Sequence, residues 1–229
     1  MAKFAKIIKE NNEDLLIKKF IQLFKSKISK NRKKRFSLVL AGGKSPIKLY
    51  KKLAKENGIA WKNIDFFISD ERYVKENSKY SNIKMCRENI LKTNKIKNKQ
   101  VHAISINKKS IKLDANNYEK KIKKYFKNKK AKFDLILLGI GNDGHIASLF
   151  KKNIYKKTNQ NVSFVRKGKF SRITLTLKCI NNSRSIFLWV PGKKKISIIK
   201  KILADKIFKY PVSFLKKENN FLFYSNWFC

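Results

Sequence analysis

Hydrophobic and polar positions along the chain follow two periods that predict strands and helices in turn. Short apolar runs, of the length typical of buried strands, alternate with longer amphipathic stretches. The first amphipathic stretch, Asn12–Ser29, places Leu16, Phe20 and Phe24 on one side of a helix. It therefore predicts a helix with one buried face, packed against a sheet.

The same patterns divide the rest of the chain into further strands and helices. Strands are expected at Phe36–Ala41, Ile64–Ser69, 101–105, Phe133–Leu138, 171–180, 185–192 and 221–225. Helices are expected from Pro46 to about Asn57, from Ser81 to about Leu91, over Asp114–Phe126, from the glycine loop after Leu138, and over 193–204, opening near Gly192.

This alternation predicts a mostly parallel sheet with helices on both faces, a Rossmann-like three-layer α/β fold. The length of 229 residues suits one α/β domain, and no linker rich in Pro, Gly or Ser divides the chain. We therefore expect a single α/β domain over residues 1–229.

Charge is the most unusual feature of the composition. The chain has 57 Lys and Arg against 15 Asp and Glu, a formal net charge of +42, which would suit a nucleic acid or another polyanion. However, the excess is mostly lysine, is spread along the chain, and accompanies abundant Asn, Ile and Phe, all with A/T-rich codons. Biased genome composition explains this pattern without a ligand, so no specific nucleic-acid partner is expected.

Several other classes of protein have little support in the sequence. No apolar run approaches the ~20 residues of a membrane span, and the N-terminal segment lacks a signal-peptide core, so we expect a cytoplasmic protein without a membrane partner. Cys86, Cys179 and Cys229 are far apart and odd in number, which argues against disulfides and zinc. His102 and His145 are also far apart, so no metal site is expected.

The segment Leu-Ala-Gly-Gly-Lys-Ser-Pro, residues 40–46, resembles part of a nucleotide-binding P-loop. A P-loop needs a glycine five positions before the Gly of Gly-Lys-Ser, where this chain has Leu38. The segment instead predicts a strand, a two-glycine turn and a helix N-terminus at Pro46, which together suit an anion such as phosphate. A tight connection without any ligand is the alternative.

A second glycine loop, Gly139-x-Gly141-x-x-Gly144, has the spacing of a dinucleotide fingerprint. That fingerprint also needs an acidic residue about 20 positions later, and the chain has no Asp or Glu between His145 and Ala204. Nicotinamide binding is therefore not expected.

His145 follows this loop directly and is a candidate base. Imidazole can take a proton from water near neutral pH, and Asp143 could orient it. Backbone N–H groups of the glycine loop could stabilise charge on a carbonyl oxygen. The alternative is that His145 only caps a helix. His102, on a short apolar strand, is expected to be structural.

A charged turn, Asp70-Glu71-Arg72, follows the strand at Ile64–Ser69. Its carboxylates could bind sugar hydroxyls, and Arg72 could bind a phosphate or an oxyanion; a solvated charge cluster is the alternative. Ligands of such folds bind at the carboxyl ends of the strands. We therefore expect the loops at 42–46, 70–74 and 139–145 to meet in one crevice.

These motifs, in this order, resemble those of the 6-phosphogluconolactonases. The resemblance rests on residues 38–50, 61–74, Ser81-Asn82 and 133–150, and less strongly on the segments around Arg172 and Lys195. Glucosamine-6-phosphate deaminases share the Gly-Gly turn and the Asp-Gly-His loop but continue with Phe-Asn-Glu. Here Ser148-Leu149-Phe150 follows, which favours the lactonases.

The resemblance implies hydrolysis of 6-phospho-D-glucono-1,5-lactone to 6-phosphogluconate in the oxidative pentose phosphate pathway, without metal or cofactor. His145 would activate water and later protonate the ring oxygen, with Asp143 in support, and Arg72 would position the substrate and stabilise the transition state. The expected substrate contacts are Gly42, Gly43, Lys44, Ser45, Asp70, Gly141, Gly144, Arg172 and Lys195.

The only partner expected is this phosphorylated sugar lactone, for a monomer or small homo-oligomer. Two other classes stay open: a deaminase-like sugar-phosphate isomerase, and a polyanion-binding protein that uses an enzyme fold.

Overall fold

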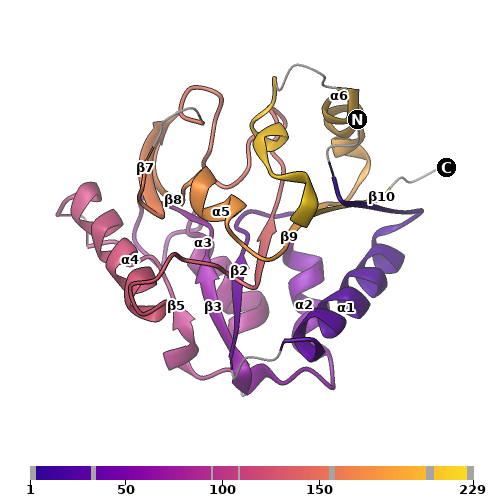
Figure 1. Cartoon of the computed structure of the whole chain (residues 1–229), viewed down its shortest axis with the longest axis horizontal. Helices are drawn as coiled ribbons and strands as arrows, with labels where there is room; N and C mark the ends of the chain where they lie inside the picture. The colour runs from indigo at the N-terminus through magenta and orange to yellow at the C-terminus, as the bar shows by residue number, and fades with distance from the viewer. Residues whose placement is uncertain are drawn as a thin grey trace.

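A computed structural model describes residues 4–31, 35–93, 95–107, 109–154, 158–204 and 209–225. Seven strands form a parallel central sheet, in agreement with the predicted fold class (Figure 1). In spatial order they are β1 (Lys6–Glu10), β10 (Asn220–Ser225), β9 (Ile186–Val190), β6 (Leu135–Leu138), β2 (Phe36–Leu40), β3 (Ile64–Ile68) and β5 (Val101–His102). All their carboxyl ends therefore lie along one edge.

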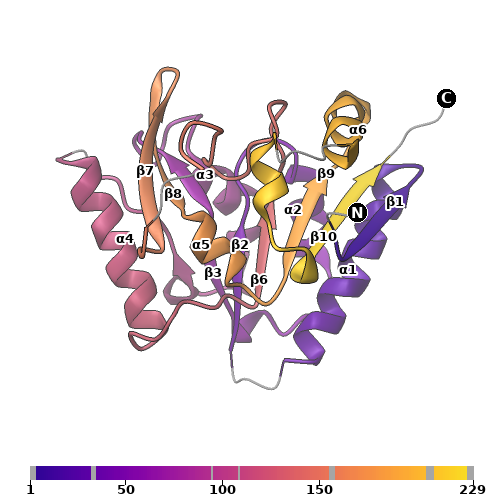
Figure 2. The same ribbon diagram turned by 45° about the horizontal axis from the view of Figure 1, so that its top comes forward.

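Helices cover both faces of this sheet, as the alternating pattern predicted. Helices α2 and α3 lie behind the sheet in Figures 1 and 2, whereas α5 lies in front of it. The helices are α1 (Glu13–Ser29), α2 (Ile47–Lys55), α3 (Asn82–Cys86) with a π-helical turn at Arg87–Leu91, α4 (Ile111–Tyr125), α5 (Leu177–Asn181) and α6 (Ile196–Ala204).

A second, smaller sheet lies beside the central one. It is antiparallel and contains β4 (Asp70–Arg72), β8 (Phe170–Leu175) and β7 (Val162–Lys167), in that order. The charged turn expected at residues 70–74 thus begins as a strand. The expected strand at 171–180 ends at Leu175, because the Thr176 side chain accepts a hydrogen bond from the Cys179 N–H and starts α5.

The prediction of a helix after the second glycine loop is wrong. This segment makes turns and a single β-bridge between Ile146 and Leu149, and Ala147 has φ +47°. A left-handed residue cannot continue a right-handed helix.

The remaining differences concern element bounds. Strand β5 covers only Val101–His102, α4 begins at Ile111, and a 3₁₀ turn at Lys193–Lys195 precedes α6. Strands β1 and β7 were not expected.

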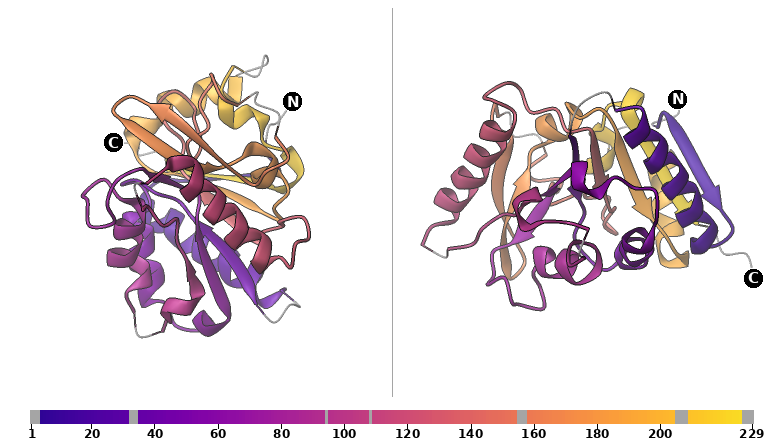
Figure 3. Two further views of the ribbon diagram at one scale, coloured as in Figure 1. Left: turned by 90° about the vertical axis from the view of Figure 1, so that its left-hand side faces the viewer. Right: turned by 90° about the horizontal axis from the view of Figure 1, so that it is seen from below.

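Aromatic side chains fill much of the core between α1 and the sheet. The Phe20 ring lies 5.4 Å from the ring of Phe187, 5.5 Å from Trp189 and 5.3 Å from Phe223. The right-hand view of Figure 3 shows α1, in indigo, against this end of the sheet. Apart from Phe150, the buried hydrophobic residues of the described segments form a single cluster.

The structure also bears on the predictions about membrane spans and cysteines. Over the described segments, none of the helices is long and apolar enough to cross a membrane. Cys86 and Cys179 are buried and unpaired, and Cys229 lies outside the described residues.

Candidate active site

The three loops expected to converge do meet, in a cavity of about 130 Å³ at the carboxyl edge of the central sheet. Strands β2 and β6 are neighbours in that sheet, so the loops that follow them start side by side. Strand β4 and its partner β8 close the third side. The predicted residues that line the cavity are Gly42, Gly43, Ser45, Asp70, Arg72, Gly141, His145 and Arg172.

The Gly-Gly turn presents a helix N-terminus to this cavity. Gly43 has φ +83°, which favours glycine, and Pro46 caps the nine-residue helix α2. Among the described residues, no hydrogen bond accounts for the backbone N–H groups of Lys44 and Ser45. Free N–H groups at a helix N-terminus favour an anion. The Lys44 side chain is exposed, and Lys44 does not line the cavity.

His145 and Asp143 form a contacting pair. The His145 ring hydrogen-bonds to Asp143 Oδ1 through Nδ1, which leaves Nε2 available for a proton. Burial alone would raise the pKa of Asp143, but the hydrogen bonds and charge of His145 outweigh it and lower that pKa. Asp143 thus remains a carboxylate that can stabilise a protonated imidazole, although it does not itself line the cavity.

The glycine loop fits tightly around this histidine. A Cβ on Gly141 would lie 2.0 Å from Nδ1 of His145, so only glycine fits there. The N–H of Gly141 donates to the His145 carbonyl (2.8 Å), and that of Gly144 donates to the Gly141 carbonyl (3.0 Å). These two N–H groups therefore hold the loop and are not free to stabilise an oxyanion, contrary to expectation. Gly144 lies outside the cavity lining.

Lys195 reaches the glycine loop rather than the cavity. Its Nζ donates to the Ile140 carbonyl (3.0 Å) and to Asn142 Oδ1 (2.6 Å). Burial lowers the pKa of Lys195, although the charge of Asp143 opposes the shift. In this structure Lys195 therefore supports the loop that carries the histidine.

The two carboxylates of the charged segment have different surroundings. Asp70 lines the cavity and accepts hydrogen bonds from the hydroxyls of Ser69 (3.1 Å) and Ser148 (2.7 Å). Glu71 instead accepts backbone N–H groups at the start of α3, those of Asn82 (2.7 Å) and Ile83 (2.8 Å). The expectation that Glu71 binds sugar hydroxyls is therefore wrong, because its carboxylate caps a helix.

Two arginines face each other across the small sheet. Arg72 of β4 and Arg172 of β8 are directly paired, and both line the cavity. The Nε atoms of both are buried and have no hydrogen-bond partner among the described residues. Burial lowers the pKa of Arg172, and the charge of Arg72 adds to this shift, whereas the charges of Asp70 and Asp143 oppose it. Two cations with unused Nε donors favour negatively charged groups of a ligand in this cavity.

Sequence analysis missed the part played by Phe150. Its ring lies 4.7 Å from the His145 ring and 5.5 Å from the Arg172 guanidinium, so it packs against both the candidate base and the anion site. Asn82, quoted above only as part of a motif, also lines the cavity. His102 stacks on Phe67 at 4.5 Å and does not line the cavity, as expected of a structural residue.

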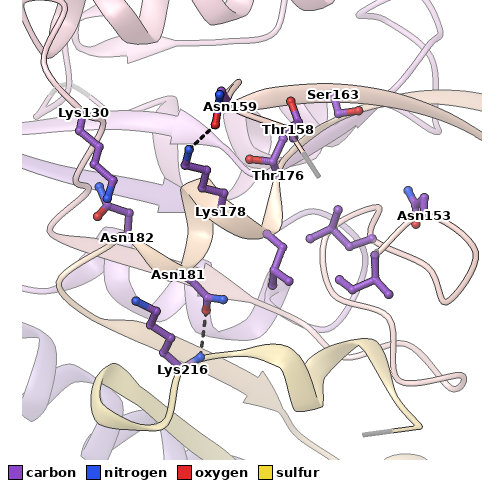
Figure 4. A pocket seen from close by; sticks show the side chains of 13 residues that line it. Lys130, Asn153, Thr158, Asn159, Ser163, Thr176, Lys178, Asn181, Asn182 and Lys216 are labelled. Carbon is purple, nitrogen blue, oxygen red and sulfur yellow. Dashed lines mark hydrogen bonds between the residues drawn. The ribbon is translucent and has the colours of Figure 1, made fainter. Parts of the chain in front are cut away.

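A larger cavity of about 640 Å³ lies elsewhere, beside the start of α5 (Figure 4). Some of the polar groups that line it already form hydrogen bonds with one another. Lys178 Nζ donates to Asn159 Oδ1 (2.7 Å), and the Lys216 N–H donates to Asn181 Oδ1 (2.9 Å). The described residues that line it include no histidine, no carboxylate and none of the predicted site residues. Its size alone does not make it the reaction site.

The sequence is similar to a known family and to curated proteins over most of its length. The family described as glucosamine-6-phosphate isomerases/6-phosphogluconolactonase matches residues 11–224. The chain is 34% identical over 198 residues to the 6-phosphogluconolactonase of Thermotoga maritima, across 84% of this chain and 87% of that protein. It is 30% identical over 219 residues to the 6-phosphogluconolactonase of Synechocystis sp., across 92% and 91%.

A solved structure shows the same fold. The crystal structure of the 6-phosphogluconolactonase from Thermotoga maritima superimposes with a TM-score of 0.84 at 32% identity, covering 96% of this chain and all of that chain (100%). Together with the family match over nearly the whole sequence, this likeness shows that the chain belongs to the family of glucosamine-6-phosphate isomerases and 6-phosphogluconolactonases.

Proposed function

We propose that this protein hydrolyses 6-phospho-D-glucono-1,5-lactone to 6-phosphogluconate. One observation carries the proposal: a histidine with a carboxylate partner shares a small cavity with two arginines whose Nε donors are unused. A base for water and a site for an anion are what the hydrolysis of a phosphorylated lactone needs. The relatives from Thermotoga maritima and Synechocystis sp. both bear the name 6-phosphogluconolactonase.

In the first step, Nε2 of His145 takes a proton from water as the water oxygen attacks the lactone carbonyl. Asp143 stabilises the positive imidazolium that results, through the hydrogen bond at Nδ1. The carbonyl oxygen becomes negative in this step. The N–H groups of Gly141 and Gly144 are already used within the loop, and we assign the stabilisation of this charge to Arg72, which lines the cavity.

In the second step, the tetrahedral intermediate collapses and the bond between the carbonyl carbon and the ring oxygen breaks. The imidazolium of His145 returns its proton to the ring oxygen, which becomes a hydroxyl group. The new carboxylic acid loses its proton at neutral pH, so each turnover releases one acid equivalent. These steps need neither a metal nor a cofactor.

The phosphate binds at the other end of the cavity, against the N-terminus of α2. Gly42, Gly43 and Ser45 line this part, and the free N–H groups of Lys44 and Ser45 face an anion there. Arg172 completes the site. Lys195, whose Nζ donates to the Ile140 carbonyl of the glycine loop, is the further cation proposed to contact the phosphate.

A deaminase or isomerase has less support from the site. The position that follows His145-Ile146-Ala147 is Ser148, whose hydroxyl donates to Asp70. Phe150 stands where the deaminase motif Phe-Asn-Glu has its Glu, and among the described residues Asp70 is the one carboxylate in the cavity lining.

We also propose that residues 1–229 act as one catalytic domain in the cytoplasm, as a monomer or small homo-oligomer. The single hydrophobic cluster of the described residues supports one domain. Specific nucleic-acid binding is not part of the proposal, because the lysine excess is spread along the chain.

The test is acid release from freshly generated 6-phosphogluconolactone, measured above the spontaneous rate. His145→Ala is expected to lower kcat by roughly 10²- to 10⁴-fold, the usual contribution of a general base. His102→Ala, which removes the other histidine, is the matched control and should retain the rate. Full activity in His145→Ala would contradict the mechanism.

A further inference from the structure

Asn82 is a buried polar residue in the wall of the candidate active site. It is the first residue of α3, lines the cavity, and has a relative exposure of 2%. Its Oδ1 accepts the Gly43 N–H (3.3 Å), and its Nδ2 donates to the Asp70 carbonyl (2.8 Å). One side chain thus joins the Gly-Gly turn to strand β4.

Gly42 shows how closely these parts approach. A Cβ at Gly42 would lie 2.1 Å from Cγ of Asn82 and 2.2 Å from its Nδ2, far inside contact distance. Gly42 is not among the glycines with positive φ. The requirement for glycine at position 42 therefore comes from the Asn82 side chain and not from backbone conformation.

The position of Asn82 is itself fixed by strand β4. Glu71 Oε1 accepts the Asn82 N–H (2.7 Å), and Glu71 Oε2 accepts the Ile83 N–H (2.8 Å) and the Ser81 hydroxyl (3.1 Å). Glu71 immediately precedes Arg72 in β4. The residue that holds the Gly-Gly turn is thus attached at its own backbone to the strand that carries the arginine.

We propose that Asn82 is a positioning residue that holds the phosphate-binding turn in its binding position against strand β4. This inference rests on the proposed lactonase function. The turn binds the phosphate equally in the ground state and the transition state, so its displacement weakens binding of both. Loss of Asn82 should therefore raise KM and leave kcat nearly unchanged.

The first test compares Asn82→Ala and Asn82→Asp with the wild type. Asn82→Ala is expected to raise KM about tenfold, because the Gly43 N–H of the phosphate-binding turn loses its acceptor. The value of kcat should stay within about threefold of the wild type. Asn82→Asp keeps the acceptor for Gly43 but loses the donor to Asp70 and places a negative charge beside the anion site, so KM rises further. Dissociation constants for inorganic phosphate should follow the same order.

Asn89→Ala is the matched control. Asn89 lies in the π-helical turn that follows α3 and bonds the Met85 carbonyl (2.7 Å), but does not line the catalytic cavity. Its KM and phosphate affinity should not change. A fall in kcat without a change in KM in Asn82→Ala would overturn the proposed role.

A double-mutant cycle with Gly42→Ala tests the contact directly. Gly42→Ala should lower the melting temperature strongly in the wild type, and much less in Asn82→Ala, which lacks the atoms that the new methyl group would meet. Gly139→Ala is the control, because nothing lies within 4 Å of a Cβ there. Its effect on the melting temperature should not depend on residue 82. Equal effects of Gly42→Ala in both backgrounds would overturn the inference.

The melting and phosphate-binding measurements keep this inference separate from the proposed function. A wild type without lactonase activity would end the proposed function and, with it, the predicted effect on KM. The coupling between positions 42 and 82 would still be decided by the cycle, and the loss of phosphate affinity by the dissociation constants.

Discussion

At the scale of single residues, the site depends on charges that stabilise one another. Asp143 keeps a lowered pKa because the hydrogen bonds and charge of His145 outweigh the effect of burial. For Arg172 the balance is different: burial lowers its pKa, the charge of Arg72 adds to this shift, and the charge of Asp70 opposes it.

The first prediction concerns Asp143→Asn, which keeps the size of the side chain and removes its charge. We expect kcat to fall by roughly 10- to 100-fold, because the imidazolium formed during catalysis loses its stabilising partner. Acid release from the lactone measures kcat, and a kcat equal to that of the wild type would contradict the pairing.

A second prediction concerns Arg172→Met. Removing one of two facing cations should raise the melting temperature of the anion-free protein by about 2–4 °C, the effect of about 1 kcal/mol in a domain of this size. The same variant should lose most of the stabilisation that phosphate gives to the wild type, and kcat/KM should fall.

Differential scanning fluorimetry with and without phosphate measures both effects. Arg166→Met is the control, because Arg166 is an exposed arginine on β7 outside the cavity. A lower melting temperature in anion-free Arg172→Met would show that the arginine stabilises the free protein.

At the scale of elements, the small antiparallel sheet carries the cations and the central sheet carries the base. Strand β4 links the two functions, because Glu71 caps α3 while its neighbours Asp70 and Arg72 line the cavity. The acceptor at the N-terminus of α3 is thus a buried carboxylate from strand β4. Burial raises the pKa of Glu71, although its backbone hydrogen bonds oppose this.

A third prediction follows for Glu71→Gln. The amide replaces one acceptor oxygen by a donor, which then faces N–H groups, so the free energy of unfolding should fall by about 2 kcal/mol. Urea denaturation measures the change. Glu76→Gln is the control, because Glu76 forms an exposed ion pair with Arg87 (2.8 Å), and such pairs contribute about 0–1 kcal/mol.

The elements that the sequence predicts well are those with a strong local pattern. Strands β2, β3 and β6 are buried at every position and mostly apolar, with Ser37 and Asp65 as their two polar residues, and α1 has one apolar face. Strand β4 has the sequence Asp-Glu-Arg, with no strand pattern, and it exists only because β8 pairs with it.

The sequence likewise predicts those parts of the site that depend on local motifs. The motifs placed His145, Arg72 and the Gly-Gly turn together correctly, since loops after parallel strands meet at one edge. What could not be predicted depends on contacts between distant residues. The approach of Asn82 to Gly42 and the use of the glycine-loop N–H groups within the loop are of this kind.

At the scale of the whole molecule, carboxylates are few, and a buried one helps to join several elements. Asp65 at the start of β3 pairs with Arg35, accepts a hydrogen bond from Tyr125 of α4 (3.0 Å), and lies 3.8 Å from His102 of β5. Burial alone would raise the pKa of Asp65, but His102, Arg35 and Tyr125 outweigh it and lower the pKa to about 2.

The fourth prediction is a pH dependence of stability. Because the folded-state pKa of Asp65 lies below its unfolded value of about 3.9, its contribution is fully present above about pH 4 and is lost as the pH falls towards 2. Asp65→Asn should be less stable than the wild type at pH 7 and lose less stability over this interval. Urea titrations at several pH values measure this, and parallel curves would contradict it.

The order of strands has a consequence for synthesis of the protein. Strand β1 leaves the ribosome first, yet its one neighbour in the sheet is β10, and Phe20 of α1 packs on Phe223 of the same late strand. At about 5–20 residues per second, roughly 10–40 s of translation separate the two strands. For that time the nascent chain carries an unpaired strand edge and an uncovered aromatic face, the kind of surface that chaperones recognise.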